Sequence, residues 1–404
     1  MFKIRAILVF LLAIGCLLLS QTPIANAQVE SDERALLNVR NGISISQDSL
    51  FLLNLRFRMQ NRFGLQSLSG NDLSVNQIDA RVRRLRLRFD GYVLNEKLQY
   101  YIQLSFSRAD QELDQAVVPQ VVRDAVLYYH FNDNFYVGMG QAKLPGNRQR
   151  VVSSGNLQFA DRSMLNNELT IDRDFGFFGY GNWPTAIGKL NVKTALTTGE
   201  GRGSLPGNNG LAYTARLEWL PFGDFKGGGD YSEGDLVREA KPKLSLGFGA
   251  SNNMGARRVG GQLGQELYAS RDLYTQMADA VLKYRGWALS QEYIARNVNN
   301  PLVYNTDSSN FQVVYKGSGH NTQLSYYFKS GHELALRYTR MLPHAEIQPF
   351  RKQTEELWFG WNKYLNGHRI KTQMLVRYRW VDGNMALNQA GNHWATMLQV
   401  EFGI

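Results

Sequence analysis

Within the segment 82–93, VRRLRLRFDGYV, apolar and charged residues alternate strictly from Arg84 to Asp90. From Leu85 to Asp90, each apolar side chain is followed by an arginine or an aspartate, so an extended strand has one apolar and one charged face. The same period of two recurs in 51–62, 98–106 and 370–380. We expect such a chain to build β-strands that separate an apolar medium from a polar one.

The lengths of the strands and of their connections select one β architecture. The alternating segments are long, whereas strands of globular proteins are usually about 5–6 residues. Short connections such as 366–367 alternate with long ones such as 63–80 and 343–353. We therefore predict an all-β fold, a transmembrane antiparallel up-and-down β-barrel of about 16 strands. An even strand number puts both chain ends on one side, with short periplasmic turns and long external loops.

Two further features bear on this architecture. Tryptophans such as Trp183, Trp219 and Trp380 fall near strand ends, where barrels carry aromatic girdles at the lipid interfaces. The mean hydropathy of −0.34 is compatible with a barrel, because only alternate residues meet lipid. The glycine-rich piece 221–241 is long where the alternation expects a short turn, and nothing in the sequence accounts for it.

The first residues indicate export. Lys3 and Arg5 precede a short apolar run, and Ala25 and Ala27 form a small-x-small cleavage site. We predict that 1–27 is a cleaved signal peptide.

The remaining chain is assigned to two parts. We predict that 28–48 is an N-terminal periplasmic segment and that 49–404 is the barrel. The only cysteine, Cys16, lies in the signal peptide, so the mature chain forms no disulfide. The expected location is the outer membrane of a two-membrane bacterium, where a multi-pass protein contacts outer-membrane lipid and lipopolysaccharide.

The free-energy cost of an arginine side chain that faces lipid indicates which way the arginines of this strand point. An arginine that faces lipid at the bilayer midplane costs about 2–4 kcal/mol, so three of them cost about 6–12 kcal/mol together. Arg84, Arg86 and Arg88 are therefore expected to face the interior. Arg83 has the opposite parity, and we expect its long side chain to reach the headgroup region.

The interior face is strongly basic, and the formal net charge of +10 favours an anionic partner. Loop 144–170 is longer than the usual limit of about 12–15 residues, so it is a candidate constriction loop. Whether it enters the lumen or lies at the surface stays open, as does whether the arginines select anions or merely line a wet wall. The candidate residues along an anion path are Arg56, Arg58, Arg62, Arg84, Arg86, Arg88, Lys143, Arg148, Arg150 and Arg173.

Motifs for catalysis and metal binding are not found. The six histidines are scattered, and no nucleophile elbow, phosphate-binding loop or paired-histidine spacing occurs. We predict no enzyme activity, no metal and no cofactor. Binding to nucleic acid is not expected either, because the signal peptide exports the chain.

Three segments resemble the phosphate-selective porin O and P family: RRLRLRFDGYVLNEKLQYYIQLSF, VGMGQAKLPGN and LTIDRDFGFFGYG. The resemblance is best over residues 50 to 185. It implies a sixteen-stranded homotrimeric porin whose third external loop folds into the lumen, with a preference for anions. Arg84, Arg86 and Arg88 match the family's arginine-rich second strand. Lys143 matches the lysine before its third loop, and Arg173 and Asp174 match the Arg-Asp pair after that loop.

Three functional hypotheses follow. The first is a passive porin for small anions, with phosphate or a related oxyanion as cargo. The second is a structural or adhesive outer-membrane barrel whose lumen is plugged. The third is a soluble secreted β protein that binds an acidic glycan.

Overall fold

The computed structural model describes residues 42–404 except 48–49, 112–119 and 205–206. The predicted signal peptide and residues 28–41 of the predicted N-terminal segment lie outside the described residues. The rest of that segment contains β1 (Ile43–Gln47), which pairs with the first long strand. No helix in the described ranges is long and apolar enough to cross a membrane.

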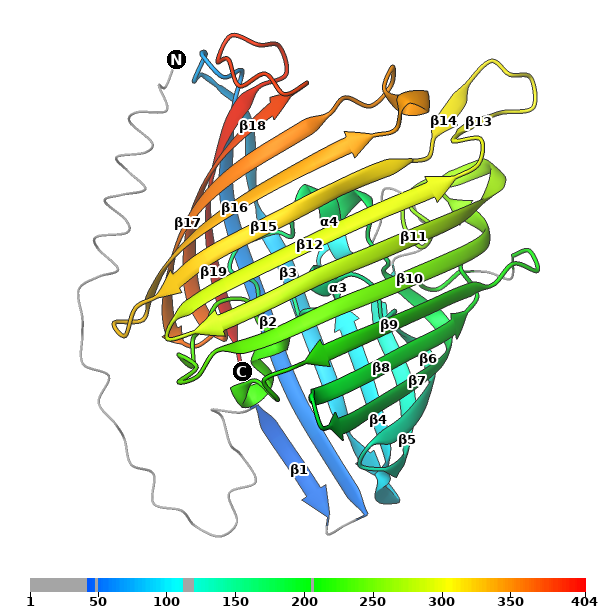
Figure 1. Cartoon of the computed structure of the whole chain (residues 1–404), viewed down its shortest axis with the longest axis vertical. Helices are drawn as coiled ribbons and strands as arrows, with labels where there is room; N and C mark the ends of the chain where they lie inside the picture. The colour runs from blue at the N-terminus through cyan, green and yellow to red at the C-terminus, as the bar shows by residue number, and fades with distance from the viewer. Residues whose placement is uncertain (1–41, 48–49, 112–119, 205–206) are drawn as a thin grey trace.

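Within the described residues, sixteen antiparallel strands close into a barrel, which confirms the predicted fold (Figure 1). They follow one another around the ring in chain order. They are β2 (Phe51–Ser67), β3 (Val75–Val93), β4 (Asn95–Ser105), β5 (Val122–Asn132), β6 (Phe135–Lys143), β7 (Arg173–Thr185), β8 (Gly188–Thr197), β9 (Ala212–Leu220), β10 (Lys243–Arg258), β11 (Glu266–Tyr284), β12 (Trp287–Val298), β15 (Gly317–Tyr327), β16 (His332–Pro343), β17 (Thr354–Asn366), β18 (Ile370–Val381) and β19 (His393–Gly403).

The ring closes between its first and last strands. In β19, residues from Ala395 to Gly403 pair with β2, and Phe57 and Ile404 exchange backbone hydrogen bonds at the end of this ladder. The short strand β1 continues along the same edge of β2, so almost the whole length of β2 is paired on both sides.

The connections alternate in length around the ring. We call the side with turns such as 133–134 and 285–286 the short-turn end, and the opposite side the long-loop end. The expected long loop 63–80 is shorter than predicted, because β2 and β3 extend into it and leave only 68–74. At the long-loop end, β13 (Leu302–Tyr304) and β14 (Phe311–Val313) form a small separate hairpin.

Side-chain parity separates the two faces as expected. On β16, Leu334 and Leu336 are exposed on the outer face, whereas Glu333 and Arg337 are fully buried on the inner face. On β3, Arg84 and Arg86 are buried inside the barrel.

The prediction for Arg83 was wrong. The register of β2 and β3 shifts between Gln60 and Asn61, which leaves Arg83 as an extra residue in β3. Its Nη2 lies 3.2 Å from Asp161 Oδ1, inside the barrel, so Arg83 does not reach toward the headgroups.

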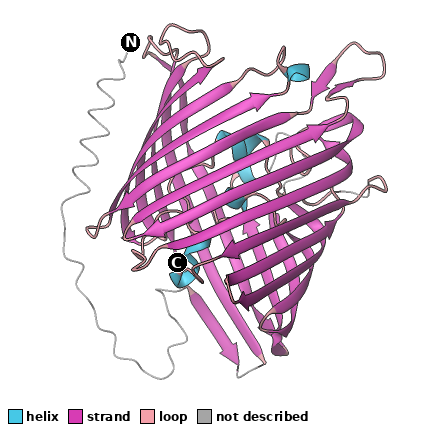
Figure 2. Cartoon of the chain, viewed as in Figure 1, coloured by secondary structure: helices cyan, strands magenta, loops and turns pink. Residues whose placement is uncertain are grey.

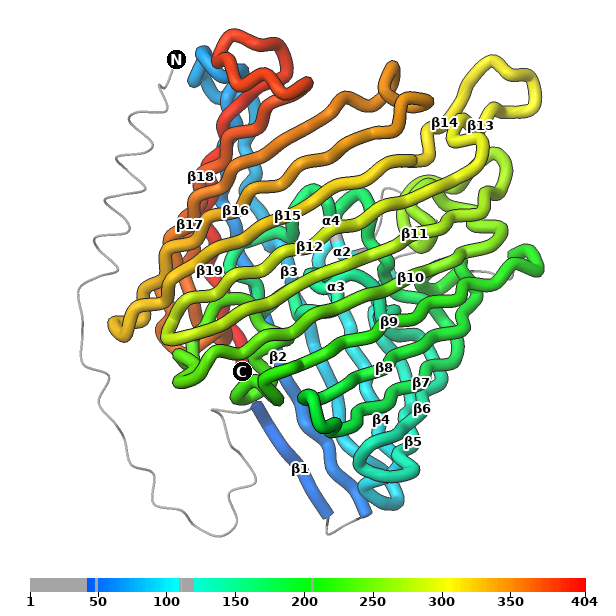
Figure 3. The backbone as a smooth tube through the Cα atoms, in the orientation of Figure 1, coloured from blue at the N-terminus to red at the C-terminus, as the bar shows by residue number. Residues whose placement is uncertain are grey.

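Two connections fold into the barrel instead of standing above it. The β6–β7 connection carries the short helices α3 (Arg148–Val151) and α4 (Met164–Glu168), which lie within the ring of strands (Figures 1 and 2). The β9–β10 connection carries η1 (Lys226–Tyr231) and packs near the short-turn end (Figure 3). Two other short helices, α2 (Arg108–Gln111) and η2 (Ala345–Ile347), lie in connections at the long-loop end.

The outer face provides a test of the fold. Leu336 lies near the middle of β16 and is 46% exposed. Replacing it with arginine is expected to lower the unfolding free energy by about 2–4 kcal/mol, because the charge would face hydrocarbon. The measurement is urea unfolding of the protein refolded into lipid vesicles, with Leu336→Met as the control of similar size. Equal stability of the two variants would mean that this face does not contact lipid.

Candidate functional site

Loop 144–170 is held on one side of the lumen by a buried arginine. Arg148 Nε lies 2.8 Å from Asp279 Oδ1 on β11, and Nη1 lies 3.4 Å from Glu218 on β9. Its third nitrogen, Nη2, donates to Ser245 Oγ at 2.8 Å. All three partners point inward from neighbouring strands, so the start of the loop is fixed to the wall formed by β9, β10 and β11.

The middle of the loop is held on the opposite side by cations that donate to its backbone. Lys371 Nζ on β18 donates to the carbonyls of Gly155 and Leu157, at 2.7 Å each. Arg337 on β16 donates twice to the carbonyl of Asp161, at 3.0 Å. The loop therefore crosses the lumen, and the alternative that it is a surface flap is excluded.

The glycine-rich piece that the sequence left unexplained supports this loop from the short-turn end. Lys283 Nζ, which is buried, donates to the carbonyls of Gly229 and Ser232 at 2.7 and 2.8 Å, which holds the piece inside the barrel. Glu233 N then donates to Asn156 O at 2.8 Å, and Glu233 Oε2 accepts from Gln158 N at 2.8 Å. The two inward segments form one body.

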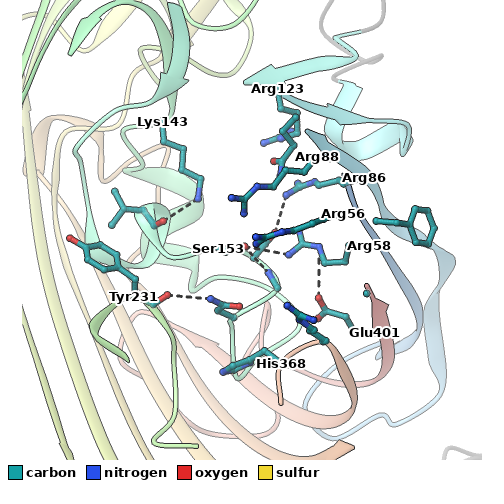
Figure 4. A pocket seen from close by; sticks show the side chains of 18 of the residues that line it. Arg56, Arg58, Arg86, Arg88, Arg123, Lys143, Ser153, Tyr231, His368 and Glu401 are labelled. Atoms are coloured by element: carbon teal, nitrogen blue, oxygen red, sulfur yellow. Dashed lines mark hydrogen bonds and ion pairs between the residues drawn. The ribbon is translucent and has the colours of Figure 1, made fainter. Parts of the chain in front are cut away.

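What remains open beside this body is a cavity of about 430 Å³. Arginines of β2 and β3 line one side of it, and Lys143 and the loop line the other (Figure 4). Ten of its lining residues are arginine or lysine, and only one, Glu401, carries a side-chain carboxylate. The cationic residues are Arg56, Arg58, Arg86, Arg88, Arg123, Lys143, Arg150, Arg162, Arg173 and Arg369.

Some of these cations are neutralised within the protein. Arg86 and Arg123 share Asp110 of α2, and Arg173 forms a two-pronged pair with Asp124. Burial would raise the pKa of Asp110, but Arg123 and Arg86 outweigh it and hold the pKa well below its usual range. Removing one partner of such a buried pair is strongly destabilising, so these pairs belong to the structure of the wall.

Other cations of the wall donate to backbone carbonyls. Lys143 Nζ donates to Val151 O at 3.1 Å, and Arg162 Nε donates to Gln149 O at 2.7 Å. Within the described residues, neither these two nor Arg369 has a carboxylate within 4.0 Å. A backbone carbonyl satisfies a donor without cancelling the charge, so these cations can still attract an anion.

A second cavity of about 250 Å³ lies on the long-loop side of the loop. It contains Arg62 and Arg81 but also Asp79 and Glu356, so its charge is mixed. Arg162 lines both cavities, which places this unpaired guanidinium at the boundary between them.

The structure brings seven of the ten predicted residues together around the larger cavity, all except Arg62, Arg84 and Arg148. Arg62 lines the second cavity and pairs with Asp161 at 2.7 Å. Arg84 is buried and donates to Gln60 Oε1 at 2.6 Å. Arg148 is the loop anchor described above.

Sequence reasoning missed several lining residues. Arg123 lies beside a register shift at Gln103 and Leu104, so simple alternation does not assign it to the interior. Arg369 lies in a short turn, and Tyr231 belongs to the piece that folds in from the short-turn end. In the described ranges, no cluster of three or more His, Cys, Asp and Glu could hold a metal ion.

Comparisons with known proteins agree with this architecture. The family model described as phosphate-selective porin O and P matches residues 53–402. A comparison with curated protein sequences found no significant match.

Among solved structures, the chain is similar to outer-membrane expressed OmpT of Vibrio cholerae, with a TM-score of 0.54, 10% identity, and coverage of 89% of this chain and 100% of that one. The in-vitro folded trimer form of the same protein gives 0.53 and 11%, with 88% and 100% covered. OmpF of Salmonella typhi, solved in complex with daunomycin, gives 0.54 and 13%, with 89% and 100% covered. At these identities the likeness shows the fold.

The loop anchor provides a test of the site. Replacing Arg148 with methionine leaves Asp279 and Glu218 without this partner, and breaking a buried pair costs about 3–5 kcal/mol. We expect loop 144–170 to loosen, so that trypsin cleaves it in the folded barrel after Arg150 or Arg162. Arg81→Met is the control, because Arg81 is exposed and its ion pair contributes little. Equal protection of the two variants would contradict the anchoring role.

Proposed function

Because the chain belongs to the phosphate-selective porin O and P family, and is therefore an outer-membrane porin and not an enzyme, we propose that it passes small anions in preference to cations. The observation that carries this proposal is the position of Arg162. Its guanidinium lines both cavities and has no carboxylate partner among the described residues, so positive charge lies where the path crosses the loop.

The chemistry of the larger cavity favours oxyanions. A guanidinium offers a planar fork of donors that matches the oxygens of phosphate or a carboxylate. Arg88 is partly exposed and shares Asp90 with Arg56, so one carboxylate serves two guanidiniums. Phosphate and related oxyanions are therefore the proposed cargo, and the surplus cations replace part of the hydration that the anion loses.

The proposal extends to the oligomeric state of the protein and to its export. We infer a homotrimer from the family and from the trimer form of the structurally similar OmpT. We also propose that residues 1–27 are a signal peptide that is removed on export.

The experiment is a reversal-potential measurement on the purified protein in a planar bilayer under a KCl gradient. We expect the protein to conduct ions, with a reversal potential whose sign shows that chloride is more permeant than potassium. A potential of the sign set by potassium would contradict anion preference. A complete lack of conductance would instead support the plugged barrel.

The charge of the cavity wall is tested by changing Arg56, Arg58 and Arg88 to glutamine together. One unit charge about 8 Å from the ion contributes about 0.5 kcal/mol in a water-filled space. Losing three costs chloride about 1.5 kcal/mol and favours potassium by the same amount, so the chloride-to-potassium permeability ratio is expected to fall about a hundredfold.

The matched control changes three exposed lysines to glutamine, Lys241, Lys329 and Lys352. It therefore lowers the net charge by the same amount as the triple arginine variant. It is expected to keep the permeability ratio of the unmodified protein. An equal decrease in both triple variants would show that net charge, not the cavity wall, sets the preference.

A further inference from the structure

Aromatic side chains form a continuous band on the inner wall next to the basic cavity. His130, Tyr136 and Tyr180 are cross-strand neighbours on β5, β6 and β7. Their rings stack in sequence, with centroids 4.5 Å apart between His130 and Tyr136 and 4.6 Å apart between Tyr136 and Tyr180. All three are half-buried, so part of each ring faces the lumen.

A second row of the band lies one step closer to the loop. The ring of Tyr128 makes edge contacts with Tyr136 and Tyr180 at 5.9 and 6.0 Å. It lies against the backbone of Gly138, where an added Cβ would stand 2.7 Å from the ring. The glycine therefore leaves the space that this ring needs to lie along the wall.

Cationic groups border the band on both sides. On one side, the guanidinium of Arg88 lies 4.6 Å from the centroid of Tyr101. On the other, Lys193 is the cross-strand neighbour of Tyr180 and pairs with Glu218 at 2.8 Å. A molecule that contacts the rings therefore lies between two cationic side chains, each of which also has a carboxylate partner.

The rings and the cations share a cavity of about 220 Å³. Three tyrosines, Tyr101, Tyr128 and Tyr180, line it together with Lys143 and Lys193. Lys143 also lines the larger basic cavity, so the two spaces adjoin at its ammonium group. A cavity of roughly 150 Å³ is enough to bind a benzene ring.

We propose that this cavity binds organic anions in which a phosphate or carboxylate is attached to a ring with a flat face. The anionic group lies at Lys143 and the adjoining arginines, and the ring lies on the tyrosines. The electron-rich faces of tyrosine rings attract the edges of aromatic rings and the C–H groups of a sugar ring. This proposal rests on the proposed anion preference and adds a ring-binding surface that inorganic phosphate cannot use.

The experiment measures how strongly added anions block the chloride current of single channels. Inorganic phosphate, phenyl phosphate and glucose 6-phosphate carry the same anionic group, so differences between them report the ring. In the unmodified protein we expect at least one of the two ring compounds to block at about a tenfold lower concentration than inorganic phosphate. The compound that does so identifies the kind of ring.

The aromatic band is tested by Tyr128→Leu and Tyr180→Leu, each of which removes one ring that lines this cavity. The advantage of the ring compound over inorganic phosphate is expected to fall about tenfold, while block by phosphate itself stays constant. Tyr129→Leu is the control, because Tyr129 is on β5 but faces outward.

The proposal of ring binding and the proposal of anion preference are contradicted by different outcomes. If neither ring compound exceeds inorganic phosphate in the unmodified protein, or if Tyr129→Leu reduces the advantage as much as the inner variants, ring binding is refuted. If the reversal potential in the same bilayers has the sign of potassium, the proposed anion preference fails, whatever the ring compounds do.

Discussion

The cost of placing a cation in hydrocarbon determines how this molecule is built. Because arginine cannot face lipid cheaply, the strand faces that carry it must turn inward, and the interior of the barrel becomes crowded with positive charge. That charge needs partners. The chain supplies them by folding two connections into the lumen, where their backbone carbonyls accept hydrogen bonds from Arg337, Lys371 and Lys283.

The inward cations therefore divide into two groups with different consequences. Arg148 and Lys371 are buried and saturated, and they hold the loop in place. Lys143 and Arg162 donate to carbonyls but, among the described residues, pair with no carboxylate. The first group fixes the position of the loop, and the second adds positive charge to the wall of the cavity that the arginines of β2 and β3 also line.

The sequence was sufficient for those features that depend on alternation. The strict pattern around Arg86 and Arg88 predicted the inner face of β3, and the loop lengths predicted the barrel and its two ends. The alternation in the sequence could not predict features that depend on a single inserted residue. In the sequence, the bulge that turns Arg83 toward Asp161 is visible only as an arginine of the opposite parity, which does not by itself indicate an inserted residue.

The sequence also could not predict contacts between residues that lie far apart in the chain. Arg148 and its partner Asp279 are 131 residues apart, so only the path of the loop across the lumen makes Arg148 an anchor. The inward turn of the glycine-rich piece depends on Lys283, which lies on another strand and donates to its carbonyls. The aromatic band is a cross-strand feature, because His130, Tyr136 and Tyr180 come from three strands and meet only through their register.

The central claim is that anions occupy the basic cavity between the arginine wall and the folded loop. The most direct measurement is anomalous diffraction from crystals of the intact protein soaked in bromide. Bromide is expected inside the barrel, in contact with Lys143, Arg162 or the guanidiniums of β2 and β3. Bromide at surface lysines and arginines, with none in this cavity, would contradict the claim.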